Sequence, residues 1–282
     1  MNNIGAIRSH MKSIRQTVKI STAQKLIAGA RIVKARRMLE NSRPYHNRIQ
    51  HSIAAVLGDC DEKSKYLDLG QEIHKRGLLV ISADRGLAGG YNQHIIKLAA
   101  QTMAEKHVVK LLAVGHIGYE KLLHIGAPVA DDFFYKVENP SMYIAREIAS
   151  RMMDLYENGE VDCFDVIYTH YLSAVRMVPM RERLFPLSPE MLGDPVTHFS
   201  EYESPPDEVL ELLIPKYLKG FLFGCLIQAW MCELNSRVQA MDSAVKNGNK
   251  MFDKLSLQYN RARQGAITQE ITEIVAGAAA MI

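Results

Sequence analysis

The sequence contains little cysteine and no pattern that would put cysteine to chemical use. Its four cysteines, Cys60, Cys163, Cys225 and Cys232, form no Cys-x-x-Cys pair and have no histidine cluster at zinc-ligand spacing. Those motifs are the usual sequence signs of a zinc site or a redox dithiol. Cys225 and Cys232 lie seven residues apart in an apolar stretch, which suits buried thiols, and we expect a reducing compartment with no structural disulfide and no metal.

Long uninterrupted apolar runs are also missing. The most apolar long stretch is 209–232, and Glu211, Pro215, Lys216 and Lys219 interrupt it. A helix that crosses a bilayer needs about 20 consecutive apolar residues. The start of the chain lacks the apolar segment of a signal peptide. We expect a soluble protein with no direct membrane span and no signal peptide.

Catalytic constellations are equally scarce. Asp131 and Asp132 form a carboxylate pair, but no histidine or metal motif accompanies them. Ser82 has no Gly-x-Ser-x-Gly context, and the histidines are scattered. Acid–base or nucleophilic catalysis needs such groups within hydrogen-bond reach of one another. The sequence therefore predicts no catalytic residues, no cofactor and no enzymatic activity of the chain by itself.

Charge is distributed unevenly along the chain. Residues 1–50 carry eleven lysines and arginines but only one acid, Glu40, whereas the remaining 232 residues carry 23 basic and 30 acidic side chains. A basic arm on an acidic body indicates an anionic partner, although a solvated helix face is the simpler alternative. No aromatic residue that could stack on bases occurs in the arm before Tyr45. We therefore favour an acidic protein over a nucleic acid.

Apolar or small residues recur at alternating steps of four and three near both ends of the chain, the spacing of a coiled-coil seam. The first seam has polar breaks at Ser21 and Lys25 and consists of Ile7, Met11, Ile14, Val18, Ser21, Lys25, Ala28, Ile32, Ala35 and Leu39. The second seam consists of Met231, Leu234, Val238, Met241, Val245, Gly248, Phe252, Leu255, Tyr259, Ala262 and Ala266.

These seams predict two long helices that pair as an antiparallel coiled coil. A helix over 4–43 would be about 60 Å long, and one over 216–275 about 90 Å long. We expect Pro44 to bend or interrupt the first helix, because proline removes a backbone donor and clashes with the preceding turn. The second helix should begin near Pro206 and extend past its partner.

The middle of the chain alternates short apolar runs with helical patterns, which is typical of an open, mostly parallel sheet. We expect strands at 78–83, 108–114, 164–171 and 175–184, and helices at 91–106, 117–124 and 141–156. The predicted fold class is α/β, with a central Rossmann-like domain beside the long antiparallel coiled coil. We place the domain limits at 1–56, 57–206 and 207–282.

Two further segments admit two readings each. Residues 82–92, SADRGLAGGYN, lie between a predicted strand and a helix, where phosphate-binding loops occur, but they match neither of the common glycine-rich nucleotide motifs. We favour a tight structural turn over a nucleotide site. Residues 274–282 are small, apolar and uncharged. They either dock on the body of the protein or enter the apolar collar of a partner.

Several segments resemble F-type ATP synthase gamma subunits, in the same order along the whole chain. The most specific is 261–280, RARQGAITQEITEIVAGAAA, which is similar to the C-terminal signature of that family. Residues 82–92 resemble the central motif, 8–20 resemble the N-terminal helix, and 237–242, RVQAMD, match as well.

The resemblance implies a function. The coiled coil would stand inside a ring of three alpha and three beta subunits. The opposite end of the chain, which includes the α/β domain and is called the foot, would rest on the membrane ring of c subunits. The epsilon subunit would be a further partner. Rotation of the shaft would couple ion flow to ATP synthesis or hydrolysis on beta. The chain would lie on the cytoplasmic face of the bacterial plasma membrane as a peripheral, non-catalytic subunit.

Site residues follow from the same resemblance. The catch loops of beta would contact Arg263, Gln264, Thr268, Glu270, Lys12, Arg15 and Lys19, with the last three in the same zone on the opposing helix. The lower part of the ring would contact Arg237, and the c ring would contact Tyr202 and Glu203. The bearing tip would consist of Ala276, Gly277, Ala278, Ala279, Ala280, Met281 and Ile282.

The sequence departs from its relatives at three points. Ala23-Gln24 replaces a common Ala-Met, Ser204 replaces a usual proline, and the redox-regulatory cysteine insertion of chloroplast relatives is not recognisable. Two other functions remain as alternatives to a rotor subunit. One is a coiled-coil scaffold that carries an α/β domain, and the other is a nucleotide-binding enzyme that uses residues 84–92.

Overall fold

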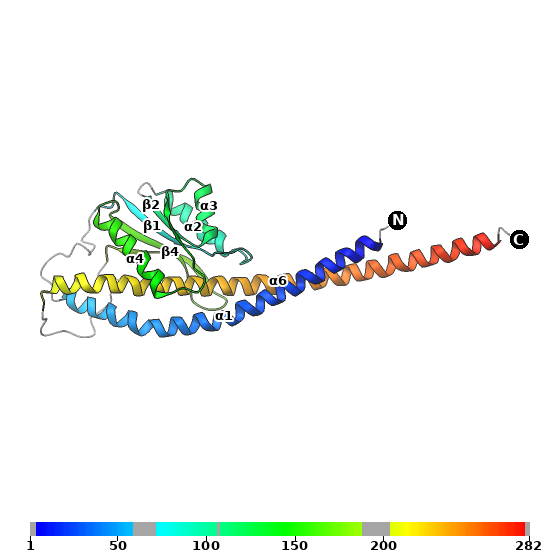
Figure 1. The fold of residues 1–282 in the computed structure, drawn as a ribbon, viewed down its shortest axis with the longest axis horizontal. Helices are drawn as coiled ribbons and strands as arrows, with labels where there is room; N and C mark the ends of the chain where they lie inside the picture. Colours follow the sequence, from blue (N-terminus) through cyan, green and yellow to red (C-terminus); the bar gives the residue numbers. More distant parts are fainter. Residues whose placement is uncertain (1–3, 59–71, 106–107, 188–203, 280–282) are drawn as a thin grey trace. The chain divides into compact units, whose positions relative to one another are not determined.

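The computed structural model describes residues 4–58, 72–105, 108–187 and 204–279, with two long helices at the ends of the chain and an α/β domain between them (Figure 1). Among the predicted residues, Cys60, Tyr202, Glu203, Ala280, Met281 and Ile282 lie outside the described part. The chain forms two compact units. Met1–Ala28 joins Arg237–Ile282, and Gly29–Ser236 forms the second unit.

The second unit contains a five-stranded sheet in the order β3-β2-β1-β4-β5. The strands are β1 (Arg76–Ile81), β2 (Val108–Val114), β3 (Val129–Tyr135), β4 (Cys163–Tyr171) and β5 (Met177–Phe185). The first four strands are parallel and β5 pairs antiparallel with β4. The crossovers are α2 (Tyr91–Met103), α3 (His116–His124) and α4 (Met142–Glu157). The predicted α/β fold class is confirmed.

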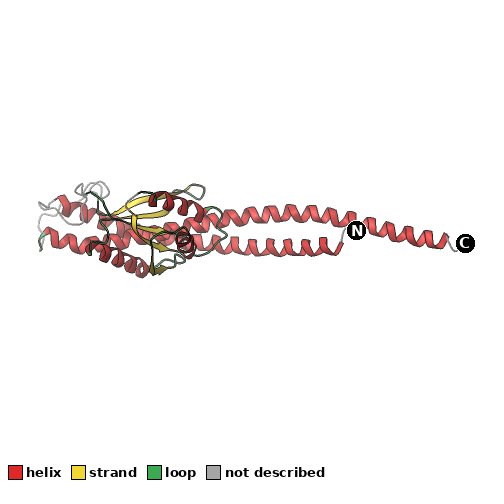
Figure 2. Ribbon diagram, turned by 90° about the horizontal axis from the view of Figure 1, so that it is seen from above, coloured by secondary structure: helices red, strands yellow, loops and turns green. Residues whose placement is uncertain are grey.

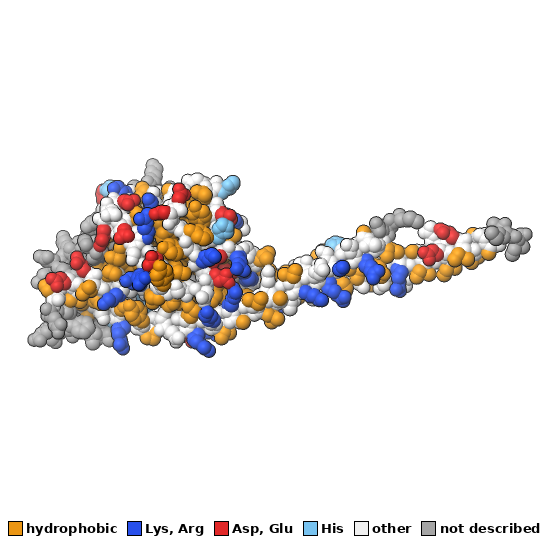
Figure 3. Space-filling view, viewed as in Figure 1, with side chains coloured by type: hydrophobic (Ala, Val, Ile, Leu, Met, Phe, Trp, Pro, Cys, Tyr) orange, Lys and Arg blue, Asp and Glu red, His pale blue; other side chains and the backbone are white. Residues whose placement is uncertain are grey.

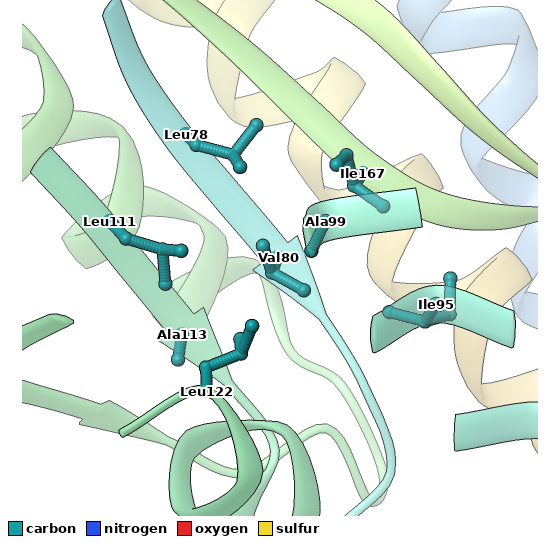
Figure 4. Close-up of a cluster of buried hydrophobic side chains, with 8 residues drawn as sticks. All are labelled: Leu78, Val80, Ile95, Ala99, Leu111, Ala113, Leu122 and Ile167. Carbon is teal, nitrogen blue, oxygen red and sulfur yellow. The ribbon is translucent and has the colours of Figure 1, made fainter. Parts of the chain in front are cut away.

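The apolar runs form the strands because both faces of the sheet are covered. Every residue of β1 is buried, which explains why 78–81 is a continuous apolar run rather than an alternating one, while the buried Arg76 at its start pairs with Asp165. On one face, α2 and α3 cover the sheet (Figure 4). This core cluster consists of Leu78, Val80, Ile95, Ala99, Leu111, Ala113, Leu122 and Ile167.

The sequence predicts most of these elements but not β3. In that strand Asp131 and Asp132 are exposed, since β3 is an edge strand with only part of its surface covered. The predicted hairpin between β4 and β5 is present, with the Leu172 and Ser173 N–H groups donating to the Arg176 carbonyl oxygen. Apolar and polar residues alternate irregularly along β3, so its hydrophobic periodicity is weak. The sequence analysis did not predict this strand for that reason.

Both terminal helices are longer than predicted. The first, α1 (Ile4–Gly58), contains Pro44, and the last, α6 (Pro206–Ala279), contains Pro215. Of the bend or interruption expected at Pro44, the interruption does not occur, because α1 continues through this residue. Packing on both sides of Pro44 offsets the lost hydrogen bond, with Leu39 buried before it and His46 stacked on Tyr217, ring centroids 5.3 Å apart, after it.

Every residue of the two predicted seams is buried or half-buried. On α1, most residues that lie between successive seam positions are exposed. In the first unit the ends of α1 and α6 run antiparallel (Figure 2). Lys25 of α1 meets Asp242, whereas Arg15, earlier on α1, meets Phe252, later on α6. The two units divide both long helices, and the domain limits at 1–56, 57–206 and 207–282 stay a prediction.

Candidate functional site on the paired helices

A close approach fixes the register of the two helices in the first unit. A Cβ atom added to Gly248 of α6 would lie 2.5 Å from Val18 Cγ2 and 4.0 Å from Ile14 Cγ2, both on α1. No real side chain tolerates the shorter of these distances without movement. Gly248 therefore provides the gap that Val18 fills, and a shift of one helix along the other would lose this fit.

A charged triad lies in the same seam. Lys25 Nζ donates to Asp242 Oδ1 at 2.6 Å, and Lys246 Nζ lies 2.8 Å from Asp242 Oδ2. Hydrogen bonds from Lys246 and Lys25 lower the pKa of Asp242 to about 2, and the same carboxylate raises the pKa of Lys246. The polar break that the sequence shows at Lys25 is thus a specific contact between the helices.

The pH dependence of this contact is a first prediction. Because the folded pKa of Asp242 is lowered from the usual 3.8 to about 2, the contribution of the triad is complete above about pH 4 and is lost as the pH falls towards 2. We expect a carbon-13 NMR titration of the isolated chain to place the Asp242 midpoint near 2. The Lys246→Ala variant should raise that midpoint. A midpoint at the ordinary aspartate value in the unmodified chain would contradict the triad.

The three basic residues predicted on α1 form an exposed stripe with steps of three and four residues, namely Lys12, Arg15 and Lys19. The Arg15 guanidinium lies over the ring of Phe252, 5.0 Å from its centroid. This contact gives Arg15 a fixed place on the helix pair through a cation–π interaction. Figure 3 shows lysine and arginine side chains along the paired helices.

The residues predicted on α6 are exposed too, and comprise Arg263, Gln264, Thr268 and Glu270. The Thr268 hydroxyl donates to the Gln264 carbonyl oxygen at 2.9 Å, so it is engaged with its own helix. Along α6, Arg263 and Glu270 are seven residues apart and share one face, whereas Gln264 and Thr268 share the adjacent face. The four residues therefore form two neighbouring exposed stripes.

The structure does not bring these two predicted groups to one level. Arg15 is opposite Phe252, while a groove with Ile4 and Ile7 on one side has residues up to Gln269 on the other. Arg263 therefore lies near the first turn of α1, eleven residues beyond Phe252, which is about 16 Å at 1.5 Å per residue. The two groups therefore lie at two levels along the pair, and their shared contact zone with beta stays a prediction.

The end of α6 carries a feature that the sequence analysis did not identify. Near the end of α6, four large apolar side chains are exposed at successive steps of four, three and one residues: Ile267, Ile271, Ile274 and Val275. Of the predicted tip, residues 276–279 are also exposed and helical. An exposed apolar stripe of this kind indicates a surface that another molecule covers. The spacing was visible in the sequence.

Arg237 is the remaining predicted contact in the described part of the chain. It is the first residue of α6 in the first unit and is half-buried. The predicted foot contacts, Tyr202 and Glu203, stay predictions because they lie outside the described residues.

The glycine-containing loop after β1 uses its polar side chains internally. Ser82 Oγ accepts the Gly118 N–H at 2.9 Å, Asn92 Oδ1 accepts the Ala83 N–H at 2.9 Å, and Asp84 Oδ2 accepts two further backbone N–H groups. These side chains hold neighbouring loop segments together, as the side chains of a structural turn do. The geometry supports the reading of a structural turn.

The other candidate groups are dispersed. Asp132 pairs with Arg151 at 2.7 Å, and within the described residues no three His, Cys, Asp or Glu side chains are grouped as metal ligands. Cys163, Cys225 and Cys232 are free and buried, and the burial of Cys225 and Cys232 agrees with their apolar sequence context. Burial raises the pKa of Cys163 to about 11 and that of Cys232 to about 12, so these thiols stay protonated and unreactive.

No helix in the described part of the chain is both long enough and apolar enough to cross a bilayer. A family model described as "ATP synthase" matches residues 3–281. The long helix pair, the α/β domain and this match together define a subunit of the ATP synthase class.

Curated relatives specify which subunit it is. The chain is 40% identical to an ATP synthase gamma chain of Ruminiclostridium cellulolyticum, over 99% of both chains. It is 32% identical to a sodium ion specific ATP synthase gamma chain of Acetobacterium woodii, again over 99% of both. The chain belongs to the ATP synthase gamma chain family.

Solved structures share the fold at lower identity. A chain from the Euglena gracilis mitochondrial ATP synthase aligns with a TM-score of 0.72 at 14% identity, covering 99% of this chain and 94% of that one. A chain from the central stalk and c ring of the Tetrahymena thermophila enzyme aligns with a TM-score of 0.60 at 20% identity, covering 80% of this chain and 99% of that one.

Proposed function

We propose that this chain is the rotor shaft of an F-type ATP synthase, which couples rotation of a c ring to ATP synthesis or hydrolysis on beta subunits. The observation that carries the proposal is the helix pair of the first unit. Its seam is buried or half-buried, its register is set by Gly248 and by the Lys25–Asp242 contact, and α6 continues beyond the level of the first residues of α1. A shaft needs a fixed register so that torque applied to one helix moves both.

The surface of the pair supports two kinds of contact with a surrounding ring. Lys12, Arg15 and Lys19 would meet acidic loops of beta, and Arg263, Gln264, Thr268 and Glu270 would make directional hydrogen bonds at a second level. Off-axis, directional contacts of this kind can transmit torque. Arg237 would contact the lower part of the ring, and the foot would contact the c ring and the epsilon subunit. These contacts would place the complex on the cytoplasmic face of the bacterial plasma membrane.

The uncharged end of α6 would act as a bearing. Residues 276–279 are exposed and offer small side chains without charge, so few directional bonds would have to break at each step. We expect deletion of residues 276–282 to reduce ATP synthesis in the reconstituted complex without abolishing it. Assembly should weaken, because apolar burial contributes about 25 cal/mol per Å². If the truncated complex assembles normally but shows no coupling at all, the bearing role is contradicted, and the contact that transmits torque lies at the tip.

Assembly and catalysis test the proposal. Coexpression with alpha and beta should yield one copy of this chain with three of each, and the complex should hydrolyse ATP. We expect the isolated chain to show no hydrolysis, because it lacks a P-loop lysine. ATP hydrolysis that persists after removal of beta would contradict the proposal and favour an enzyme. A chain that purifies without alpha and beta would also contradict it and would favour a separate scaffold.

A further inference from the structure

We propose that residues 82–92, together with residues 136–140, form a clamp that fastens both long helices to the α/β domain. Its contacts on α1 and α6 lie close in sequence to the limits of the second unit, Gly29 and Ser236. The inference rests on the proposed shaft function, and it gives the conspicuous loop after β1 a role that is neither nucleotide binding nor a simple turn. All contacts that carry it lie within the second unit.

The attachment to α6 is buried. The Tyr91 hydroxyl donates to the Ala229 carbonyl oxygen of α6 at 3.1 Å, and burial raises the pKa of Tyr91, which keeps it a donor. Ala83, Ala88 and Tyr91 form one apolar cluster with Cys232 of α6. Cys232 is only four residues before Ser236, the last residue of the second unit on this helix.

The attachment to α1 is polar and runs through the segment after β3. Asp84 Oδ2 accepts the backbone N–H groups of Val137, at 3.0 Å, and of Glu138, at 2.7 Å. Glu138 then pairs through one carboxylate oxygen with Arg31 of α1 and through the other with Arg85, at 3.4 Å. The loop after β1 thus positions Glu138 from two sides, by its backbone and by its side chain.

A second contact from the same segment reaches α1 one turn further on. Lys34 Nζ donates to Asn139 Oδ1 at 2.6 Å. Asn139 has a left-handed backbone, with φ at 58°, a conformation that asparagine tolerates better than most residues. Arg31 lies three residues after Ala28, the last residue of the first unit on α1.

The arrangement has a mechanical consequence. One loop contacts α6 directly and α1 through Glu138, so neither helix can roll against the sheet without breaking a contact of the clamp. A single exposed ion pair contributes little, but these contacts share the Asp84 and Glu138 carboxylates and form a network. Torque that enters through the helices of the first unit would pass to the α/β domain through these groups, with Asp84 and Glu138 as positioning residues.

Torsional stiffness of the assembled complex tests the clamp. A bead can be attached to the α/β domain at Val175→Cys, a position that is 89% exposed, in a Cys60→Ser background within the complex with alpha and beta. Angular fluctuations of the bead during catalytic pauses give the stiffness of the path from ring to domain. We expect Glu138→Gln, Glu138→Ala and Asp84→Ala to lower it about twofold, since each removes shared contacts of a network.

Matched variants separate this role from general stability. Asp132→Ala removes the Asp132–Arg151 pair, which lies wholly within the α/β domain, and should leave the stiffness unchanged. Asp84→Asn keeps an acceptor oxygen for the two N–H groups and should remain close to the unmodified chain. The rotation rate with a small bead should be the same in all variants, because the clamp bears load without touching the chemistry.

The outcomes are distinct. Unchanged stiffness in Glu138→Gln and Asp84→Ala, with rotation intact, would contradict the clamp and leave the shaft function standing. An equal loss in Asp132→Ala would show a general softening of the domain and would also contradict it. An unmodified complex that does not rotate at all would contradict the proposed function, and the clamp with it.

Discussion

The Gly248→Val substitution will separate the two helices of the first unit and destabilise their pairing. Even a single methyl group at position 248 would meet Val18 Cγ2 at 2.5 Å, and a larger side chain has no room without moving a helix. Overpacking of this kind costs about 1–3 kcal/mol. Hydrogen–deuterium exchange should accelerate in peptides from both partners, around residues 14–18 and 244–252, and assembly with alpha and beta should fall.

A matched glycine on the same helix provides the control. Nothing lies within 4 Å of a Cβ atom added to Gly265, so Gly265→Ala should slow exchange slightly, by the roughly 0.5–1 kcal/mol that alanine gains over glycine in a helix. Adding Val18→Ala to Gly248→Val should restore part of the lost protection. If Gly248→Val and Gly265→Ala show the same hydrogen–deuterium exchange rates, the close approach of Gly248 to Val18 does not set the register.

Replacement of Arg263 and Gln264 by alanine should weaken assembly or coupling strongly. Both side chains are exposed in the isolated chain, so their removal leaves its own core intact. Hydrogen bonds to charged groups contribute about 1.5–3 kcal/mol each, which corresponds to a tenfold or greater loss of affinity for each bond that is removed. The measurement is the affinity of the variant for the alpha–beta ring and the ATP synthesis rate of the complex.

Exposed lysines of the α/β domain are the comparison for this pair. Lys97→Ala with Lys121→Ala removes side chains of similar exposure from α2 and α3, outside the proposed contact. This double variant should assemble and couple normally. Equal and negligible losses in both double variants would remove the functional reading of the C-terminal motif.

The sequence predicted the seams well because burial along a helix repeats every three or four residues. Spacing alone placed the polar residues Ser21 and Lys25 in the seam. In the structure Ser21 is buried and Lys25 is half-buried. The buried strands were also predictable, since β1 and β2 each contain a short apolar run, at 78–81 and at 111–114. The edge strand β3 was missed, because an edge needs apolar residues on only part of its surface.

Register could not be predicted, because it depends on two segments more than 200 residues apart. Nothing local assigns Val18 to Gly248 or Lys25 to Asp242. The separation of Lys12, Arg15 and Lys19 from Arg263 along the pair could not be predicted for the same reason, since it follows from the register. The role of Asp84 was equally hidden, because its partners Val137 and Glu138 are joined to it through backbone N–H groups.

Rotation is the measurement that tests the shaft most directly. A bead attached to this chain at Val175→Cys, in a complex with three alpha and three beta subunits fixed to a surface, should turn steadily in one direction while ATP is hydrolysed. The rate should follow the ATP concentration until hydrolysis saturates. A complex that hydrolyses ATP at an undiminished rate while the bead on an intact chain only fluctuates about one angle would contradict the central claim.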